Sequence, residues 1–479
     1  MLFTRRLLDH RASALILAAC SLPSLVVTSC SSDEETAAPP PVDGFDATLP
    51  DASDVVADVA AGQADHDAPA FDGGPRPVVC TSRHCAKSLT VPIRPTSSGT
   101  LPKHNGTWSP EAFCALLDDG TVACWGDNSV GQLGRGDDGR TTGASATPAR
   151  VVGLSNVVEL SHSCARTADG GVWCWGQGPY VEGDATVLSW EPTPVKMPVP
   201  PATHVAAGAM TACVTTNDGL VCWGANDFRQ IETSSPSLLP PTRVDLPPGA
   251  PIRELAVGRA TFLVREDGST LSWGNNPPLA RVSSLNPDPH PAPTVLHAVS
   301  SVDLVSTSAC ATSEGIGYCW GDVETDSPFA NPGEVDYGNS EDYTPSPLLR
   351  ALPEPVVAPE PLVQIATTDN VSAGYWDDEF WVREVLPRRW CAVGASGAVY
   401  CWGLNTRGQA GDGTKDAAFD TVKVEGLPAP AAEVRTMPLS TCALLTTGKV
   451  YCWGNNFCGQ LGNGHIKAES LTPQEVVLP

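Results

Sequence analysis

The sequence predicts an all-β fold, a seven-bladed β-propeller with a disordered N-terminal tether. Three observations support this prediction: one hairpin motif recurs seven times, further strand-like segments surround the copies, and an acidic segment near the N-terminus is too poor in large apolar residues to build a core. The copies are separated by 50, 49, 49, 48, 81 and 51 residues. Four short strands in each repeat of this length are typical of a propeller blade. The copies begin at Cys114, Cys164, Cys213, Phe262, Cys310, Cys391 and Cys442.

The N-terminus predicts export. Three arginines within the first eleven residues precede an apolar run that is interrupted by proline and is too broken for a good membrane span. The letters VTSC ending at Cys30 resemble a bacterial lipobox, so we expect residues 1–29 to be a lipoprotein signal peptide and Cys30 to carry the lipid. Cys20, at the end of LAAC, is the alternative lipidation site, and an ordinary cleaved signal peptide is the remaining interpretation.

Residues 30–78 are expected to form the disordered tether, and residues 79–479 the propeller. Residues 31–75 contain eleven Asp and Glu but no Lys or Arg. The whole chain of 479 residues has a net charge of −25, which argues against a nucleic-acid partner because phosphates are bound through clustered Lys and Arg. We therefore expect membrane contact through the N-terminal lipid only.

Each hairpin copy alternates apolar and polar residues around a glycine-containing turn. Copies with cysteines ten apart fit three-residue loops, whereas the copies at Cys213 and Cys310 have cysteines nine apart and fit two-residue loops. In both cases the two cysteines are directly opposed on antiparallel strands, close enough for a disulfide. The predicted bonds are Cys114–Cys124, Cys164–Cys174, Cys213–Cys222, Cys310–Cys319, Cys391–Cys401 and Cys442–Cys452.

The fourth copy loses both cysteines together, as Phe262 and Ser272, which is the behaviour of a bonded pair. Zinc would require two more ligands at each site, and no histidine recurs with the repeat. Reduced thiols remain an alternative, but export favours disulfides. We expect no metal site and no cofactor.

The Trp-Gly that ends each copy is interpreted as core between blades rather than as a ligand cage. The chain also ends in LTPQEVVLP, which resembles the proline-containing strand found upstream of other hairpins. The first hairpin has no clear strand of that kind before it. We therefore expect the C-terminal strand to complete the first blade and close the ring.

The run ALLDDGTVACWGDNSVGQLG, residues 115–134, resembles the repeat of the regulator of chromosome condensation family, with the cysteine pairs of a bacterial exported branch. The resemblance covers roughly residues 105–479 and implies a seven-bladed propeller. The family includes a nuclear guanine-nucleotide exchange factor and a secreted bacterial inhibitor of β-lactamases. Neither activity is carried over by the repeat motifs themselves.

No enzyme motif is present in the sequence: it has no nucleophile elbow, P-loop, zinc-protease helix motif or dinucleotide fingerprint. We therefore predict a protein that is not an enzyme. Cys80 and Cys85 fit a disulfide clasp better than a metal site, because His84 would be only a third ligand. Cys458 is left over, and a bond from Cys458 to Cys80 or Cys85 is the alternative pairing.

The interval between the fifth and sixth copies is about thirty residues too long, and we assign an insertion to residues 322–390. It holds the one cluster of aromatic and basic residues in an acidic chain. Trp, Tyr and Arg are common in binding hot spots, so this cluster is the candidate partner-binding surface. The alternative is that the insertion packs on its own propeller face. The candidate residues are Tyr375, Trp376, Phe380, Trp381, Arg383, Arg388, Arg389 and Trp390.

Together these features predict an exported, lipid-anchored, monomeric propeller that binds a protein partner on the bacterial cell envelope. It would lie on the outer membrane or the cell surface, or else be periplasmic or secreted. A secreted enzyme inhibitor and a guanine-nucleotide exchange factor-like regulator are the alternative functions.

Overall fold

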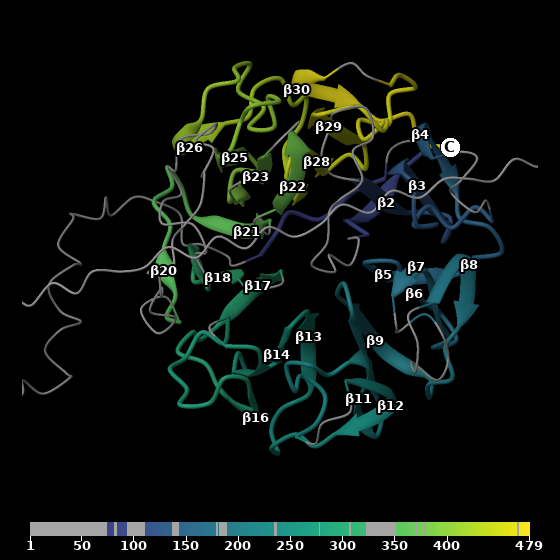
Figure 1. Cartoon of the computed structure of the whole chain (residues 1–479), viewed down its shortest axis with the longest axis vertical. Helices are drawn as coiled ribbons and strands as arrows, with labels where there is room; N and C mark the ends of the chain where they lie inside the picture. Colours follow the sequence, from purple (N-terminus) through teal and green to yellow (C-terminus); the bar gives the residue numbers. More distant parts are fainter. Residues whose placement is uncertain are drawn as a thin grey trace, which may run out of the picture. The chain divides into compact units, whose positions relative to one another are not determined.

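A computed structural model describes residues 74–80, 84–92, 111–136, 143–178, 181, 189–233, 237–276, 278–305, 308–321, 351–368, 371–377, 380–386, 388–466 and 469–479. The predicted signal peptide, Cys20, Cys30 and most of the predicted tether therefore lie outside the described residues. Residues Pro69–Pro479 belong to one compact unit. The described strands of this unit form seven four-stranded antiparallel sheets and one two-stranded sheet, so the predicted seven-bladed, all-β architecture is confirmed (Figure 1).

Each blade has four strands that follow one another along the chain, from the centre of the ring to its rim. The innermost strands are β1 (Ala86–Thr90), β5 (Val157–Ser161), β9 (Ala202–Ala207), β13 (Ile252–Val257), β17 (Val299–Leu304), β21 (Leu362–Thr367) and β27 (Ala431–Thr436). The second strands are β2 (Ala112–Leu117), β6 (Cys164–Thr167), β10 (Thr211–Thr216), β14 (Ala260–Arg265), β18 (Ser308–Ser313), β24 (Arg389–Gly394) and β28 (Ser440–Leu445).

The second strand of each blade forms the predicted hairpin with the third, and the segment that follows, which contains proline in six of the seven blades, supplies the outer strand. The third strands are β3 (Val122–Asp127), β7 (Val172–Gly178), β11 (Gly219–Ala225), β15 (Thr270–Gly274), β19 (Ile316–Gly321), β25 (Val399–Gly403) and β29 (Val450–Gly454). The outer strands are β4 (Ala144–Arg150), β8 (Ser189–Lys196), β12 (Leu238–Val244), β16 (Asp288–Pro293), β20 (Glu354–Pro355), β26 (Ala418–Lys423) and β30 (Ser470–Glu475).

The predicted way of closing the ring was wrong. The C-terminal strand β30 pairs with β29 of its own blade, whereas β1 supplies the inner strand of the first blade. The outer strand pairs with the hairpin before it in each blade and does not belong to the hairpin that comes next. A repeating sequence is compatible with either assignment, because both place the same four kinds of strand in every blade. Only the terminal strands distinguish the two arrangements.

The ring is instead closed by contacts between complete blades. The indole nitrogen of Trp125 in the first blade donates to Gln460 O of the seventh at 2.9 Å. The same bond joins other neighbouring blades, since Trp175 Nε1 donates to Gln132 O and Trp453 Nε1 donates to Gln409 O, both at 2.9 Å. The repeated Trp and the Gln of the Gly-Gln-Leu-Gly loop therefore form one inter-blade contact.

The repeated Trp of the Trp-Gly motif is buried in the core between blades, as predicted, in six of the seven blades. Trp125, Trp175, Trp223, Trp273 and Trp453 are fully buried, and Trp320 is 5 % exposed. Trp402 in the sixth blade is only half-buried and stacks on Trp390, with ring centroids 5.9 Å apart.

The hairpin register is the one expected from the cysteine spacing. Cys114 lies opposite Cys124, and Cys213 lies opposite Cys222 even though its loop is shorter. Gly120, which ends the three-residue loop of the first hairpin, has a φ of 75°, a left-handed conformation that glycine adopts without strain. Loop length and cysteine spacing therefore change together to keep the opposed pairs.

Candidate functional site: the insertion face and the sixth blade

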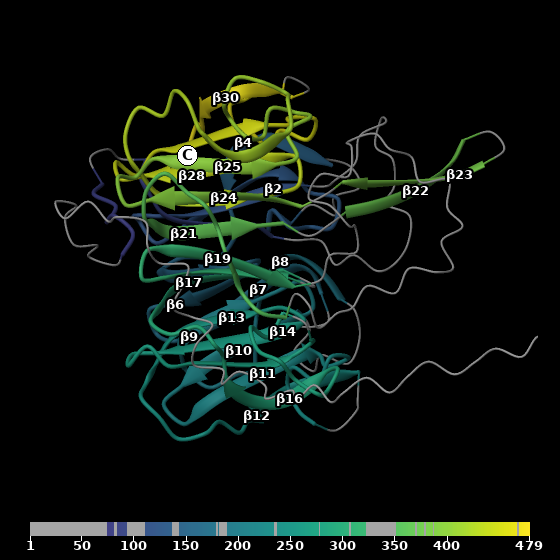
Figure 2. The same ribbon diagram turned by 90° about the vertical axis from the view of Figure 1, so that its left-hand side faces the viewer.

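The strand order gives the propeller two different faces. Because the strands of a blade alternate in direction, the connections from first to second strand and from third to fourth strand lie on one face, which we call the insertion face. The hairpin turns and the connections between blades lie on the opposite face, the turn face. The two-stranded sheet formed by β22 (Val371–Asp377) and β23 (Phe380–Leu386) interrupts a first-to-second connection, between β21 and β24, and therefore belongs to the insertion face (Figure 2).

The insertion assigned to residues 322–390 is not one segment. Residues 354–355 form the outer strand of the fifth blade, and residues 362–367 form the inner strand of the sixth. The extra chain is divided between the β19–β20 connection, whose residues 322–350 lie outside the described part, and the β22–β23 sheet. The aromatic residues of the β22–β23 sheet are conspicuous in the sequence. The two regular strands at residues 354–355 and 362–367 have no comparable sequence feature, so our assignment of the insertion includes them.

The β22–β23 sheet, which we call the ribbon, carries five of the eight candidate residues. Trp376 is directly opposite Trp381, and Tyr375 is opposite Val382. Phe380 and Arg383 also lie on β23. Among the described strands, β22 and β23 pair only with each other, and Figure 2 shows the ribbon standing off the insertion face.

The other three candidates lie in the propeller and not on the ribbon; burial corrects the prediction for Arg388 and Arg389, whereas Trp390 is half-buried. Arg388 is 8 % exposed, Arg389 is fully buried, and Trp390 packs against Trp402. Arg389 begins β24 at the junction between the sixth and seventh blades, where its guanidinium donates to backbone carbonyls of both blades. The sequence could not show that this arginine is buried, because it follows the aromatic residues of the ribbon directly and a surface arginine could occupy the same position.

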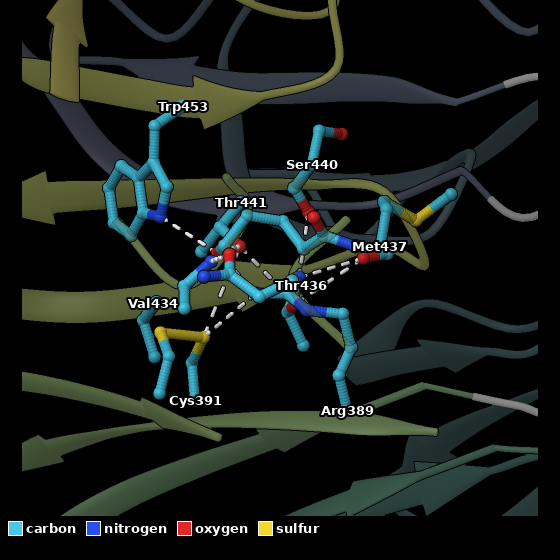
Figure 3. Close-up of a disulfide and its surroundings, with 12 residues drawn as sticks. Arg389, Cys391, Val434, Thr436, Met437, Ser440, Thr441 and Trp453 are labelled. Atoms are coloured by element: carbon cyan, nitrogen blue, oxygen red, sulfur yellow. Dashed lines mark hydrogen bonds between the residues drawn. A yellow bond between two sulfur atoms is a disulfide. The ribbon is translucent and has the colours of Figure 1, made fainter. Parts of the chain in front are cut away.

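Arg389 binds several acceptors of the seventh blade and one of its own blade (Figure 3). Its Nη1 donates to Met437 O at 2.9 Å, to Ser440 O at 3.2 Å and to the Thr436 hydroxyl, and its Nη2 donates to Gln409 O. Burial lowers the pKa of Arg389 to about 9, and the charge of Glu111 opposes that shift.

Glu111 is the second buried charge of this region. Its carboxylate accepts the Leu439 amide at 2.7 Å and the Ser440 hydroxyl at 2.5 Å. Ser440 therefore contacts Arg389 through its carbonyl and Glu111 through its side chain. Ser440 of the seventh blade is therefore held between two opposite buried charges, Arg389 of the sixth blade and Glu111 of the first.

The inner strands carry a polar network that the sequence analysis missed. Arg435 on β27 lies 2.7 Å from Glu433 and 3.7 Å from Asp303, which is two blades away on β17. Burial raises the pKa of Glu254 on the neighbouring strand β13. A signal was available in the sequence, since charged residues recur in the strand before several hairpins, but their spacing does not show that they meet at the centre of the ring.

A second group of charges joins the second and third blades. Glu159 accepts Arg166 Nε at 2.8 Å and lies 3.4 Å from His204 Nδ1. The hydrogen bond to Glu159 raises the pKa of His204. Within the described ranges, no group of three or more His, Cys, Asp or Glu side chains could hold a metal ion. These charges tie inner strands together.

All six predicted hairpin disulfides are present, with Cα–Cα distances between 4.0 and 4.2 Å. Cys80 is bonded to Cys85, with a Cα–Cα distance of 5.6 Å. Cys458 is free and half-buried, so the alternative bond from Cys458 to Cys80 or Cys85 was wrong. Disulfides in this number are typical of an oxidising environment outside the cytoplasm.

No helix among the described residues is both long and apolar enough to cross a membrane. The described elements are strands and turns throughout.

Comparison with known proteins agrees with this architecture. The family model of the "Regulator of chromosome condensation (RCC1) repeat" matches residues 111–132, 160–180 and 440–460, which contain hairpins of the first, second and seventh blades. The chain carries RCC1 repeats. Each matched stretch of this RCC1-repeat protein contains the repeated Trp-Gly, and the first and third end at Gln132 and Gln460, whose carbonyls accept the indole of a neighbouring blade.

One curated relative and two solved structures are similar to this RCC1-repeat protein over about three quarters of its length. The ultraviolet-B receptor UVR8 of Arabidopsis thaliana is 25 % identical over 371 residues, which are 73 % of this chain and 76 % of the receptor. The crystal structure of Prp20p from Saccharomyces cerevisiae, a protein with binding properties to Gsp1p and histones, superposes with a TM-score of 0.55 at 18 % identity, covering 76 % of this chain and 87 % of Prp20p. Yeast RCC1 (Prp20) bound to Kap60 gives a TM-score of 0.54 at 19 % identity, covering 75 % of this chain and 84 % of that one. At these identities the structural likeness shows the fold alone.

Proposed function

We propose that this RCC1-repeat propeller is an exported, lipid-anchored, non-catalytic module that binds a protein partner on the bacterial cell envelope through the β22–β23 ribbon. The position of the ribbon carries this proposal: it interrupts the repeat at one blade and stands off the insertion face (Figure 2). Function concentrates on such segments when a rigid scaffold holds them. Prp20p and UVR8 are named as a binding protein and a receptor, which supports a binding role for the fold.

The edges of the ribbon differ from the edges of the blades. Six of the seven outer strands contain proline, which has no amide hydrogen and so blocks the addition of another strand. The remaining outer strand, β26 of the sixth blade, has no proline but carries the charged residues Asp420 and Lys423. Neither β22 nor β23 contains proline. A partner strand can therefore form backbone hydrogen bonds with the edges of the ribbon, whereas the outer strands of the blades are protected against such pairing.

Replacing the ribbon tests the binding role. Residues 369–387 would be exchanged for the three-residue connection Gly208–Met210, which occupies the same place in the third blade and leaves Arg388 and Arg389 unchanged. Pull-down from envelope extracts is expected to lose the proteins that the wild-type chain retains. Asp218→Ala in an exposed hairpin turn on the turn face is the matched control and should retain them. Equal retention by all three chains would reject the ribbon as the binding surface.

The exported, lipid-anchored state is tested separately. Mass spectrometry of the mature N-terminus is expected to find a lipidated Cys30, and Cys30→Ala should move the protein from the membrane fraction to the soluble fraction. A lipid on Cys20, or an unmodified N-terminus released by ordinary cleavage, would replace that assignment without affecting the pull-down result.

A further inference from the structure

We propose that the Cys80–Cys85 disulfide is a thiol–disulfide exchange site, whose reduction by a dithiol releases the clasp that the N-terminal segment forms across the closure of the ring. This inference concerns the turn face and does not depend on the ribbon.

The N-terminal segment contacts the sixth and seventh blades before it enters the sheet of the first blade. Arg76 Nε donates to Ala395 O in the hairpin turn of the sixth blade at 3.1 Å. The Val79 amide donates to Thr446 O in the turn of the seventh blade at 2.8 Å. Because the first and seventh blades share no strand, these bonds bridge the place where the two ends of the ring meet.

The disulfide lies between two points at which the segment is bound to the seventh blade. Val79 precedes Cys80, and Ala86, which follows Cys85, donates its amide to Gly448 O at 2.8 Å. The carbonyl of Cys85 accepts the Asp118 amide of the first blade at 2.9 Å. Gly448 leaves room for this contact, because a Cβ at that position would lie 2.1 Å from Cys85 Sγ. The bond thus restrains the residues that hold the two blades together.

Exposure separates this disulfide from those of the hairpins. Cys80 is exposed, whereas Cys85 is fully buried. In the hairpins, eleven of the twelve bonded cysteines are at most 1 % exposed, and Cys319 is half-buried. Every hairpin bond also lies between paired strands, while Cys80 lies outside any strand. An attacking thiolate therefore has access to Cys80 that it lacks at the other bonds.

The exchange proceeds in two steps. A thiolate of the dithiol attacks Cys80 Sγ, forms a mixed disulfide and releases the Cys85 thiolate, which takes up a proton. The second thiol of the dithiol, as its thiolate, then attacks the first sulfur of the dithiol in the mixed disulfide. The dithiol closes to a disulfide, and Cys80 is released as a thiolate that takes up a proton. The protein disulfide is reduced by two electrons and two protons, and the dithiol is oxidised to a disulfide.

The test treats the oxidised full chain with dithiothreitol, quenches samples with N-ethylmaleimide and maps the labelled peptides. Cys80 and Cys85 are expected to be labelled before any hairpin pair, at a rate greater by on the order of tenfold. Amide exchange at Val79 and Ala86 should accelerate by about tenfold or more when the bond is reduced, because the loop constraint is lost. The double variant Cys80→Ser/Cys85→Ser should show the same exchange without reductant.

Cys458→Ser is the matched control and should leave both the order of reduction and the two amides unchanged. Reduction of a hairpin disulfide as early as Cys80–Cys85 would overturn the exchange site. Early reduction without faster exchange at Val79 and Ala86, in the reduced chain or in the double serine variant, would overturn the clasp.

Discussion

At the scale of single residues, His162 is a buried group with a clear consequence for pH dependence. Its side chain is 7 % exposed, and neither ring nitrogen has a hydrogen-bond partner among the described residues. Burial lowers the pKa of His162 to about 4. Between pH 6.5 and 4, the unfolded chain therefore binds a proton that the folded chain does not.

We predict that the free energy of unfolding is unaffected by His162 above pH 6.5 and decreases as the pH falls toward 4, by up to about 3 kcal/mol. His162→Asn should remove this part of the pH dependence, since asparagine tolerates the left-handed backbone at this position, where φ is 57°. Urea unfolding of the oxidised chain at several pH values measures the effect. His204→Gln is the control with the opposite sign, because a raised pKa stabilises at low pH and that stabilisation is lost as the pH rises.

Arg389 supports the junction between the sixth and seventh blades. Arg389→Met is expected to lower the free energy of unfolding by about 3–5 kcal/mol, because Glu111 and the carbonyl acceptors would lose a buried partner. Arg150→Ala is the matched control: its ion pair with Asp119 is about half exposed, so its loss should cost less than about 1 kcal/mol. Denaturant unfolding monitored by tryptophan fluorescence compares the two, and equal effects would contradict the structural role of Arg389.

Cys458 is expected to react slowly in the folded protein. Burial raises the pKa of its thiol to about 12, with smaller contributions from Asp127 and Glu111, so the reactive thiolate is scarce near pH 7. Iodoacetamide should label Cys458 only after denaturation, and without any reductant. Peptide mapping that found Cys458 in a disulfide would contradict this prediction.

At the scale of structural elements, a blade can form its hairpin without a disulfide when other contacts hold the two strands together. Phe262 lies opposite Ser272 where the other blades have opposed cysteines. Phe262 is 1 % exposed and packs on Trp320 with ring centroids 5.8 Å apart, and the Ser272 hydroxyl donates to Leu279 O at 2.6 Å. The fourth blade thus holds its hairpin by packing and hydrogen bonding.

The double substitution Phe262→Cys/Ser272→Cys is predicted to form a seventh hairpin disulfide with little net stabilisation. The bond would contribute about 2–3 kcal/mol, whereas removing the buried ring costs about 3–5 kcal/mol. Intact mass before and after reduction shows whether the bond forms, and thermal unfolding gives its effect. A large rise in Tm would show that packing by Phe262 contributes less than its burial implies.

At the scale of the whole molecule, the ring depends on its N-terminal segment rather than on a strand shared between its ends. Leu89 of β1 is 1 % exposed, and its amide donates to Glu433 Oε2 of the seventh blade at 3.0 Å. We predict that deleting residues 31–73 leaves Tm unchanged. Deleting residues 31–90 should lower Tm by roughly 10 °C or more, because the first blade loses its inner strand. Thermal unfolding of both chains decides this, and similar melting temperatures would contradict it.

The sequence alone was sufficient for the fold class, the number of blades, the hairpin registers and the six hairpin disulfides. Each of these depends on local spacing: ten or nine residues between cysteines fix which residues face each other, and the repeat then multiplies the result. The candidate ribbon residues from Tyr375 to Arg383 were also visible, because they belong to the one cluster of aromatic and basic residues in an acidic chain.

Only the tertiary structure decided how the ring closes, where Arg388 and Arg389 lie, and which charges meet at its centre. These features join residues hundreds of positions apart, such as Trp125 with Gln460, or residues two blades apart, such as Asp303 with Arg435. A periodic sequence does not show which strand is the first strand of a blade. A charged side chain likewise carries no mark of burial until its neighbours are in place.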